Sequence, residues 1–194
     1  MKFVELPRYG PVHRFSDFHV YKALHALEDG KRRGRKQLAD SVGLGEGSMR
    51  TIVEYLRDQD YIEVKQTGIR ISRRGAELLT SLPLAVARLP PTDVTLGQRS
   101  VAARISGRSD VIKSGIEQRD AAIKAGADGA TTIIVVGDRL IVPPDFDLAS
   151  EGKEIAEELQ RIFVLEDGDV IVIGTGPDYQ HAEDGALAAA FELF

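Results

Sequence analysis

An alternation of apolar and polar side chains, directly after three short amphipathic segments, most restricts how this 194-residue chain can fold. Ile62 and Val64 alternate with charged residues, and Ile69 and Ile71 do the same after a turn at residues 66–68. A period of two is typical of strands with one buried face, and a short polar turn between two such runs predicts a β-hairpin. The preceding segments follow helical spacing instead, so the first half is expected to combine helices with a hairpin rather than form a helical bundle.

Four helices are expected around this hairpin, giving the order α-α-α-β-β-α. Ser16 or Asp17 begins the first helix, Gly43 ends the second, and Ser72 begins the fourth. The third is expected over residues 46–59. The buried positions are expected to be Phe18, Tyr21, Leu24 and Leu27 in the first helix, Leu38, Ala39 and Val42 in the second, Met49, Ile52, Val53 and Leu56 in the third, and Leu78 and Leu79 in the fourth.

Two consecutive prolines, Pro90 and Pro91, mark the expected boundary between domains at 1–90 and 91–194, after a helix-compatible apolar stretch at 76–87. The first 90 residues hold 16 Lys and Arg against 11 Asp and Glu, whereas the remainder holds 9 against 19. The net charges of +5 and -10 therefore suit different partners. A basic half attracts a phosphate backbone, and an acidic half is repelled by it.

The stretch from Gly34 to Leu79 resembles the winged-helix domains of prokaryotic transcription regulators. The matching parts are Gln37-Leu38-Ala39, Val42-Gly43-Leu44, Ser48-Met49-Arg50-Thr51, the exit at residues 56–62, and Ser72-Arg73-Arg74-Gly75. The resemblance implies a third helix that enters the DNA major groove and a hairpin that acts as the wing. Over its whole length the chain also resembles a family of archaeal winged-helix proteins whose C-terminal domain has no established function. Residues 115–133 and 170–190 carry that second resemblance.

Nine residues of the first half are expected to contact double-stranded DNA. A helix in the major groove needs small or polar side chains on its exposed face, because bulky apolar groups hold the backbone away from the base edges. The third helix supplies Gly47, Ser48, Arg50, Thr51 and Glu54 there, and basic clusters lie at residues 31–36 and on and behind the wing. The expected DNA-binding residues are Arg35, Lys36, Ser48, Arg50, Thr51, Lys65, Arg70, Arg73 and Arg74.

The second half is expected to form an α/β sandwich with one mixed sheet, which makes the whole chain α+β. The expected order is β-α-β-β-α-β-α, with strands over 94–105, 131–136, 140–142 and 169–173, and helices over 116–125, 150–163 and 181–193. The second and third strands form a hairpin across Gly137-Asp138. The small apolar face of the last helix is expected to pack on this sheet or to seat a partner helix.

Gly174-Thr175-Gly176-Pro177 follows the last expected strand and precedes the last helix, where α/β proteins bind anions or small ligands. Arg119 and Lys124 supply positive charge on one expected helix, where Asp120 lies four residues before Lys124 and can pair with it. The candidate ligand-binding residues are Arg119, Lys124, Gly174, Thr175 and Gly176. Three small residues at a strand end are otherwise an ordinary turn, since no phosphate-binding lysine or full dinucleotide motif accompanies them.

No catalytic residue, metal site or cofactor is predicted. The chain has no cysteine, which excludes disulfides, thiolate zinc sites, iron–sulfur clusters and cysteine nucleophiles. Oxygen and nitrogen ligands for a metal do occur together, at Asp178, His181, Glu183 and Asp184. Carboxylates at the start of a helix are, however, explained by the helix dipole. No nucleophile or acid–base pair stands out elsewhere, so an enzyme is not expected.

These features predict a cytoplasmic DNA-binding transcription regulator whose acidic half dimerises the protein, senses a small-molecule effector, or does both. No membrane partner is expected, since no apolar run approaches the ~18 residues of a membrane span and no signal peptide is evident. One alternative is a small metabolic enzyme or nucleotide-binding protein with an accessory winged helix, favoured if the Gly174 segment lines a deep pocket beside Arg119 and Lys124. Another is a winged helix that binds RNA or protein.

Overall fold

The computed structural model describes residues 15–90 and 98–194. It divides into two compact units between Leu82 and Pro83. The boundary expected at Pro90-Pro91 therefore lies several residues too late, because the segment just before these prolines belongs to the sheet of the second unit. No helix within the described ranges is long and apolar enough to cross a membrane.

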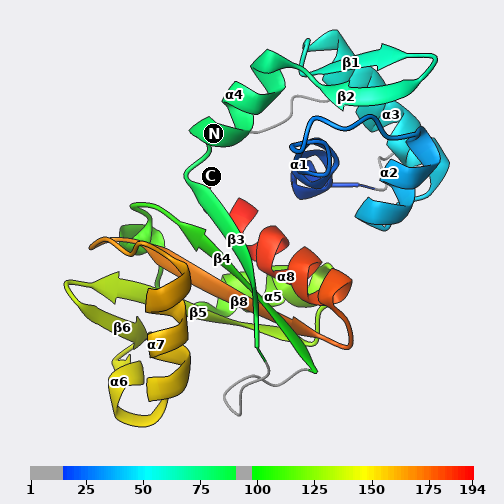
Figure 1. Ribbon diagram of the computed structural model, residues 1–194. Coiled ribbons are helices and arrows are strands. Elements are labelled where there is room, and N and C mark those ends of the chain that lie inside the picture. Colours follow the sequence, from blue (N-terminus) through cyan, green and yellow to red (C-terminus); the bar gives the residue numbers. More distant parts are fainter. Residues whose placement is uncertain (1–14, 91–97) are drawn as a thin grey trace. The chain divides into compact units, whose positions relative to one another are not determined.

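The N-terminal unit contains the four expected helices and the hairpin in the expected order (Figure 1). Its elements are α1 (Asp17–His25), α2 (Arg35–Val42), α3 (Glu46–Asp58), β1 (Ile62–Lys65), β2 (Gly68–Ile71) and α4 (Arg73–Ser81). Its core joins the apolar sides of α1, α2 and α3 to the inner side of the hairpin. The largest fully buried side chains of this core are Leu24, Leu27, Leu38, Met49, Ile52 and Leu56. The periodic apolar positions of the sequence are thus the residues that hold this unit together.

Local capping sets the helix boundaries of this unit. The backbone N–H of Ser16 donates to Nδ1 of His19 at 3.0 Å, at the start of α1. Burial and the nearby charge of Lys22 lower the pKa of His19 to about 4, so the ring is neutral and Nδ1 can accept this bond. Gly43 ends α2 with a φ of 78°, a left-handed conformation that glycine adopts without strain. The Ser72 hydroxyl accepts from the Gly75 N–H and caps α4.

The C-terminal unit is built on one six-stranded sheet of order β3-β4-β8-β5-β6-β7. Its strands are β3 (Leu84–Leu89), β4 (Arg99–Ile105), β5 (Gly129–Val136), β6 (Arg139–Val142), β7 (Phe146–Asp147) and β8 (Val170–Gly176). Its helices are α5 (Ile116–Lys124), α6 (Leu148–Glu151), α7 (Lys153–Ile162) and α8 (Tyr179–Phe191), with a short 3₁₀ helix, η1 (Ser109–Val111).

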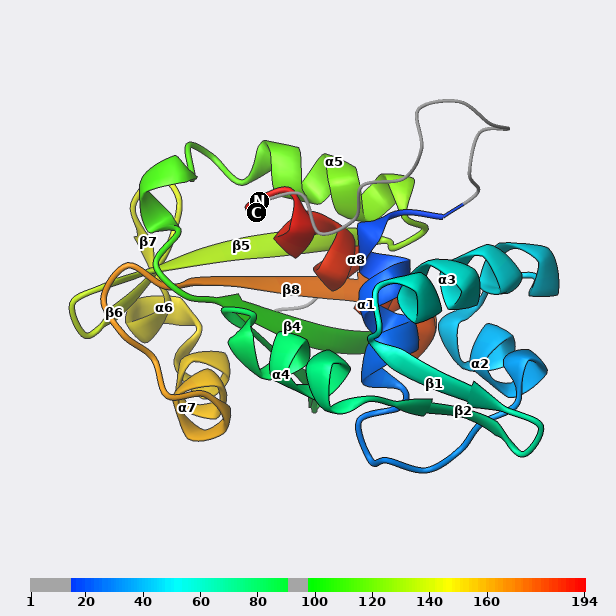
Figure 2. The same cartoon turned by 90° about the horizontal axis from the view of Figure 1, so that it is seen from above.

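Helices cover both faces of this sheet, which confirms the α/β sandwich and the α+β class of the chain. Figure 2 shows α5 and α8 on one face and α6 and α7 on the other. The small apolar face of α8 packs on its own sheet and against α5. Each face of β8 therefore contributes to a separate apolar core, and every residue of this strand is buried.

All five strand pairings of the sheet are antiparallel, where a mixed sheet was expected. A helix between two strands usually returns the chain to a parallel neighbour. Here β4, α5 and β5 form such a crossover, but β8 lies between the two strands and pairs with each of them in the antiparallel sense. The expected crossover therefore exists without a parallel pairing.

Two further strands lie outside the expected pattern. The stretch 76–87 is not one helix: α4 ends at Ser81, Pro83 follows, and β3 begins at Leu84. Proline lacks a backbone N–H and disfavours helical backbone at the residue before it, so the helix stops there. The other added strand, β7, has two residues and extends the sheet beyond β6. The expected start of the following strand at residue 94 lies outside the described residues.

A buried ion pair closes the end of the sheet where β4 finishes and β8 begins. Nε of Arg104 donates to Oδ2 of Asp169 at 2.7 Å, and the Asp169 side chain is only 2% exposed. The same carboxylate accepts from the N–H groups of Gly107 at 3.2 Å and Glu166 at 3.0 Å. With three donors on one carboxylate, the charge is well compensated despite its burial.

Candidate nucleic-acid interface

The helix-turn-helix is formed by α2 and α3, which pack together through their apolar sides. The turn between them contains Gly43, Leu44 and Gly45, and Gly45 is the N-cap residue of α3. Met49, Ile52 and Leu56 face the core, so the opposite side of α3 points to solvent. The exposed side therefore consists of the small and polar residues expected from the sequence.

Arg50 and Thr51 lie on this outer side of α3 and interact with neighbouring residues of the same helix. Nε of Arg50 lies 3.0 Å from Oε1 of Glu54, and the two side chains are 68% and 48% exposed. The Thr51 hydroxyl donates to the carbonyl of Gly47 within the same helix. An exposed pair of this kind is worth at most about 1 kcal/mol, so a phosphate or guanine can replace Glu54 at low cost.

The wing has a tight tip and a charged outer face. Its register pairs Glu63 with Arg70 and Lys65 with Gly68 across the two strands. Nε and Nη2 of Arg70 bind the Glu63 carboxylate at 2.9 and 3.0 Å, and this hydrogen bonding lowers the pKa of Glu63. Arg70 is therefore already paired within the wing, whereas Lys65 lies exposed at its tip.

Part of the basic connector at residues 31–36 has a structural role. The backbone of Arg33 exchanges two hydrogen bonds with Ile69, at 2.8 and 2.9 Å, and so forms an isolated antiparallel bridge to β2 of the wing. The Arg33 side chain forms a bidentate pair with Asp29, while Arg32 donates to the carbonyl of Gly68 and lies 3.5 Å from Glu63. These two arginines support the wing, whereas the DNA contacts expected from this stretch are Arg35 and Lys36.

The other basic residues of the expected interface lie at helix N-termini. Arg35 and Lys36 are exposed in the first turn of α2, and neither forms an ion pair within the described part of the chain. Arg73 binds Glu77 at 2.8 Å in α4, and Arg74 lies 4.0 Å from Asp60 and 5.5 Å from the Tyr61 ring centroid. Positive charge is thus present beside both α3 and the wing.

The proposed ligand loop of the C-terminal unit is not a loop. Gly174, Thr175 and Gly176 are the last residues of β8, paired with β4 on one side and β5 on the other. A Cβ atom built on Gly174 would lie 2.3 Å from the carbonyl oxygen of Ala182 in α8. The glycines bring α8 close to the sheet, so this segment is the end of a buried strand rather than a turn.

Arg119 and Lys124 are exposed on α5, but the ion pair observed on this helix is not the one expected from the sequence. Asp120 pairs with Arg119, whose Nη2 lies 3.1 Å from Oδ1, rather than with Lys124.

At the start of α8, Oδ1 of Asp178 accepts from the His181 N–H at 2.9 Å and lies 2.8 Å from Nδ1 of the same residue. Asp178 and His181 therefore cap the helix.

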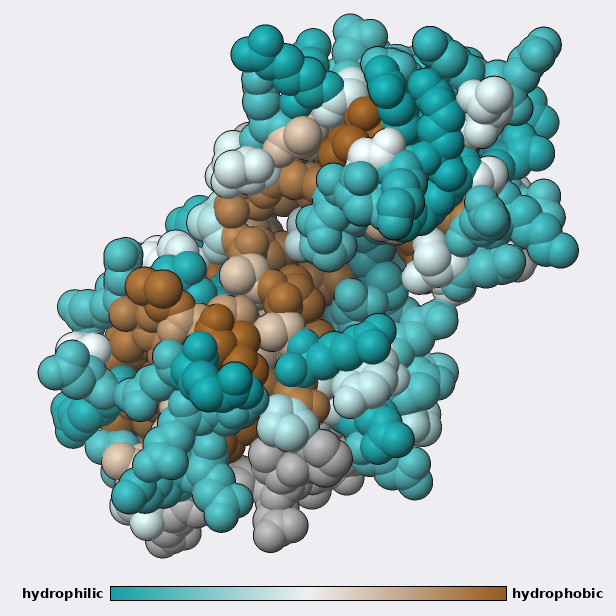
Figure 3. Space-filling view, in the orientation of Figure 1, coloured by the Kyte–Doolittle hydropathy of each residue, from teal (hydrophilic) through white to brown (hydrophobic). Residues whose placement is uncertain are grey.

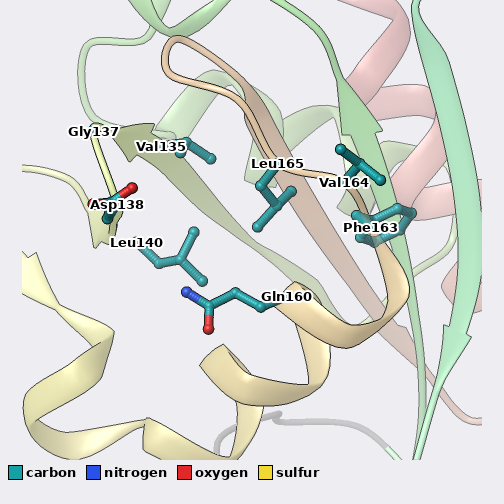
Figure 4. A pocket seen from close by; sticks show the side chains of 8 residues that line it. All are labelled: Val135, Gly137, Asp138, Leu140, Gln160, Phe163, Val164 and Leu165. Carbon is teal, nitrogen blue, oxygen red and sulfur yellow. The ribbon is translucent and has the colours of Figure 1, made fainter.

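A surface pocket occurs elsewhere in this unit, between the β5–β6 hairpin and the end of α7 (Figure 4). It encloses about 310 Å³, near the small end of the range for ligand sites. Its lining residues are Val135, Gly137, Asp138, Leu140, Gln160, Phe163, Val164 and Leu165. Figure 3 shows apolar surface on the part of the unit that contains α7 and β6. Sequence patterns did not indicate this pocket, because two separate segments, residues 135–140 and 160–165, form it.

A helix-turn-helix followed by a hairpin wing, joined in one chain to an α/β sandwich, defines a two-unit winged-helix protein. Residues 19–86 match the family described as the CggR N-terminal DNA binding domain. Residues 96–193, about half of the chain, match the family described as Domain of unknown function (DUF4443). The chain belongs to this DUF4443 family.

Two known proteins resemble the chain over different extents. A hypothetical protein, PH0730, from Pyrococcus horikoshii OT3 is 29% identical, with a TM-score of 0.69, and the match covers 90% of this chain and 91% of that one. The Central glycolytic genes regulator of Bacillus subtilis (strain 168) is 28% identical over 82 residues, which are 42% of this chain and 24% of the regulator. The chain therefore matches about a quarter of the regulator's length and nearly all of the Pyrococcus protein.

Proposed function

We propose that the protein is a DNA-binding transcription regulator in which α3 contacts the base edges and the wing contacts the phosphate backbone. The observation that carries the proposal is the small, polar outer face of α3 beside a basic wing. The match of residues 19–86 to a DNA-binding domain and the similarity to the Bacillus glycolytic genes regulator also support it. The enzyme alternative receives no support from the Gly174 segment, since α8 covers it.

Roles in the complex follow from position. Ser48, Arg50 and Thr51 lie on the outer face of α3 and reach base edges or nearby phosphates in the major groove. Lys65 and Arg70 contact the backbone from the wing, and Arg35 and Lys36 do so from the start of α2, where the helix dipole also favours a phosphate. Arg73 and Arg74 extend the positive surface behind the wing. To contact a phosphate, Arg70 would have to bind it together with Glu63 or give up its ion pair with Glu63.

Arg50→Ala is expected to reduce the preference for the selected DNA site over random DNA, because a bidentate arginine–guanine contact contributes about 1–3 kcal/mol of discrimination. The site is first selected from a random library with the purified protein, and affinities for both DNAs are then measured at one salt concentration. Arg57→Ala is the matched control, since Arg57 is also an exposed arginine of α3 in an ion pair. Equal losses on both DNAs would make Arg50 a phosphate contact.

Lys65→Gln is expected to weaken binding to all DNA sequences alike and to reduce the slope of log affinity against log salt by about one unit. The physical reason is that one phosphate contact, and the counterions it releases, are lost. Arg70→Gln is expected to act in the same direction. Titrations at several salt concentrations measure the slope. An unchanged slope in the double variant would show that the wing does not contact the DNA backbone.

The C-terminal unit is also proposed to dimerise the protein, because two winged helices read more base pairs than one. Ile116 and Ile123 are 51% and 50% exposed on α5 and lie seven residues apart, on one side of the helix. Arg119 and Asp120 lie between them. In an antiparallel pair of α5 helices, Ile116 of each copy meets Ile123 of the other, and Arg119 meets Asp120. The surface is thus complementary to itself.

Ile116→Asp combined with Ile123→Asp is expected to convert a dimer into a 21.2 kDa monomer, because four carboxylates would be placed in an apolar contact. Light scattering on the full-length chain measures the mass. Val164→Asp is the control, since Val164 is the most exposed of the large apolar residues identified in the described chain, at 81%, and lies away from α5. Dissociation by the Val164 change alone would move the contact to the end of α7.

A further inference from the structure

Two arginines from neighbouring strands converge on one tyrosine in the C-terminal unit. Arg88 of β3 lies opposite Val101 of β4, which makes Arg88 and Arg99 diagonal neighbours across the two strands. Val86 and Val101 pack toward α5 and α8, and the alternation of side chains places both arginines on that same face. Their guanidinium carbons lie 4.5 and 5.6 Å from the ring centroid of Tyr179, the first residue of α8.

The charges of these arginines are not neutralised by the residues that the structure describes. Nη1 of Arg99 donates to the Gln98 carbonyl, and neither arginine forms an ion pair within residues 15–90 and 98–194. Asp178, which precedes Tyr179, is engaged in capping α8 and binding His181. Like charges at neighbouring positions on one sheet face repel each other. The Tyr179 ring attracts each cation but carries no charge to compensate them.

We propose that Arg88, Arg99 and Tyr179 form a binding site for a small phosphate-bearing anion. Residues 83–194 hold 10 Lys and Arg against 19 Asp and Glu, so two adjacent arginines without an acidic partner among the described residues are unusual in this unit. Arginine binds phosphate through two parallel N–H donors, and stacking on Tyr179 fixes the guanidinium groups that present them. Arg99 is the register partner of Gly176, so this site borders the end of β8, but neither Gly174 nor Gly176 is one of its ligand-binding residues.

A phosphate group suits the site better than a carboxylate. Two guanidinium groups carry two positive charges, and a phosphate monoester carries about -1.5 to -2 at neutral pH, whereas a carboxylate carries one negative charge. Both arginine side chains are exposed, so a ligand can enter without a rearrangement of the sheet. In a transcription regulator such a site would receive an effector, which links it to the proposed function.

Inorganic pyrophosphate is the probe, with the full-length chain in the absence of DNA. It is expected to bind saturably by calorimetry and to raise the melting temperature above that in sodium chloride of equal ionic strength, because it binds the folded state preferentially. Arg88→Gln with Arg99→Gln is expected to weaken binding by at least about tenfold, since two charged hydrogen-bonding groups are lost. Arg139→Gln with Arg161→Gln removes the same charge from exposed positions elsewhere in the unit and should leave binding unchanged.

A double lysine variant and a folding measurement distinguish loss of binding from loss of folding. Arg88→Lys with Arg99→Lys keeps both charges but loses the planar donor pairs, and is expected to bind with intermediate affinity. Circular dichroism checks that each variant is folded. No saturable binding of pyrophosphate by the wild type, or equal losses in the two glutamine variants, would overturn the site. Either result leaves the DNA-binding proposal intact, because no DNA is present in these measurements.

Discussion

Asp169→Ala is expected to destabilise the C-terminal unit by about 3–5 kcal/mol, the range for removing one member of a buried ion pair. The change leaves Arg104 without its partner, although its side chain is only 19% exposed. It also removes the acceptor for the N–H groups of Gly107 and Glu166. These losses fall where β4 ends and β8 begins, so the centre of the sheet is affected.

Hydrogen exchange at the amides of β8, read by mass spectrometry, measures this loss in the unit concerned. Asp145→Ala is the control, because Asp145 is an exposed aspartate of the same unit. Adding Arg104→Met to Asp169→Ala is expected to restore part of the stability, since the unpaired charge is removed as well. If exchange in Asp169→Ala equals that of the control, the pair does not stabilise the sheet.

Gly174→Ala is expected to cost about 3 kcal/mol or more, although it adds one methyl group. The added Cβ would lie 2.3 Å from the Ala182 carbonyl oxygen and 2.5 Å from the Ala186 nitrogen. Both atoms belong to the backbone of α8, which cannot move aside as a flexible side chain can. The whole helix must therefore shift away from β8, and the apolar core between them is opened.

Gly129→Ala provides the matched control for this prediction. Gly129 is a strand glycine in the neighbouring β5, and a Cβ there would meet its nearest neighbour, Oγ1 of Thr175, at 4.0 Å. It is expected to change the melting temperature little, whereas Gly174→Ala lowers it strongly. Comparable melting temperatures for the two variants would show that α8 can move away from β8 without loss of stability.

The N-terminal unit could be predicted from the sequence almost element by element, because its signals are local. The alternation at Ile62 and Val64, the left-handed turn at Gly43 and the cap at Ser72 each act within a few residues. The sheet order of the C-terminal unit depends on contacts between distant segments. No local pattern indicates that β8 enters between β4 and β5, and a mixed sheet was therefore expected in place of an antiparallel one.

The errors at the candidate sites have the same origin. Gly174 and Gly176 were placed after the last strand, as candidate ligand-binding residues or an ordinary turn, whereas they lie within β8 and permit close contact between a strand and a helix. Arg32 and Arg33 belong to the basic cluster at residues 31–36, but their partners are Asp29, Glu63 and the wing backbone. Charge in a sequence identifies a cation without identifying the group that it meets.

The position of β8 also governs when the C-terminal unit can form during synthesis. Both β4 and β5 pair with this strand, yet residues 170–176 leave the ribosome after every other strand of the sheet. Until then the nascent chain holds two incomplete halves of a sheet, each with an open edge where β8 belongs. The winged helix is complete by residue 81, so it can fold before β8 has been synthesised and while the edges of β4 and β5 are still unpaired.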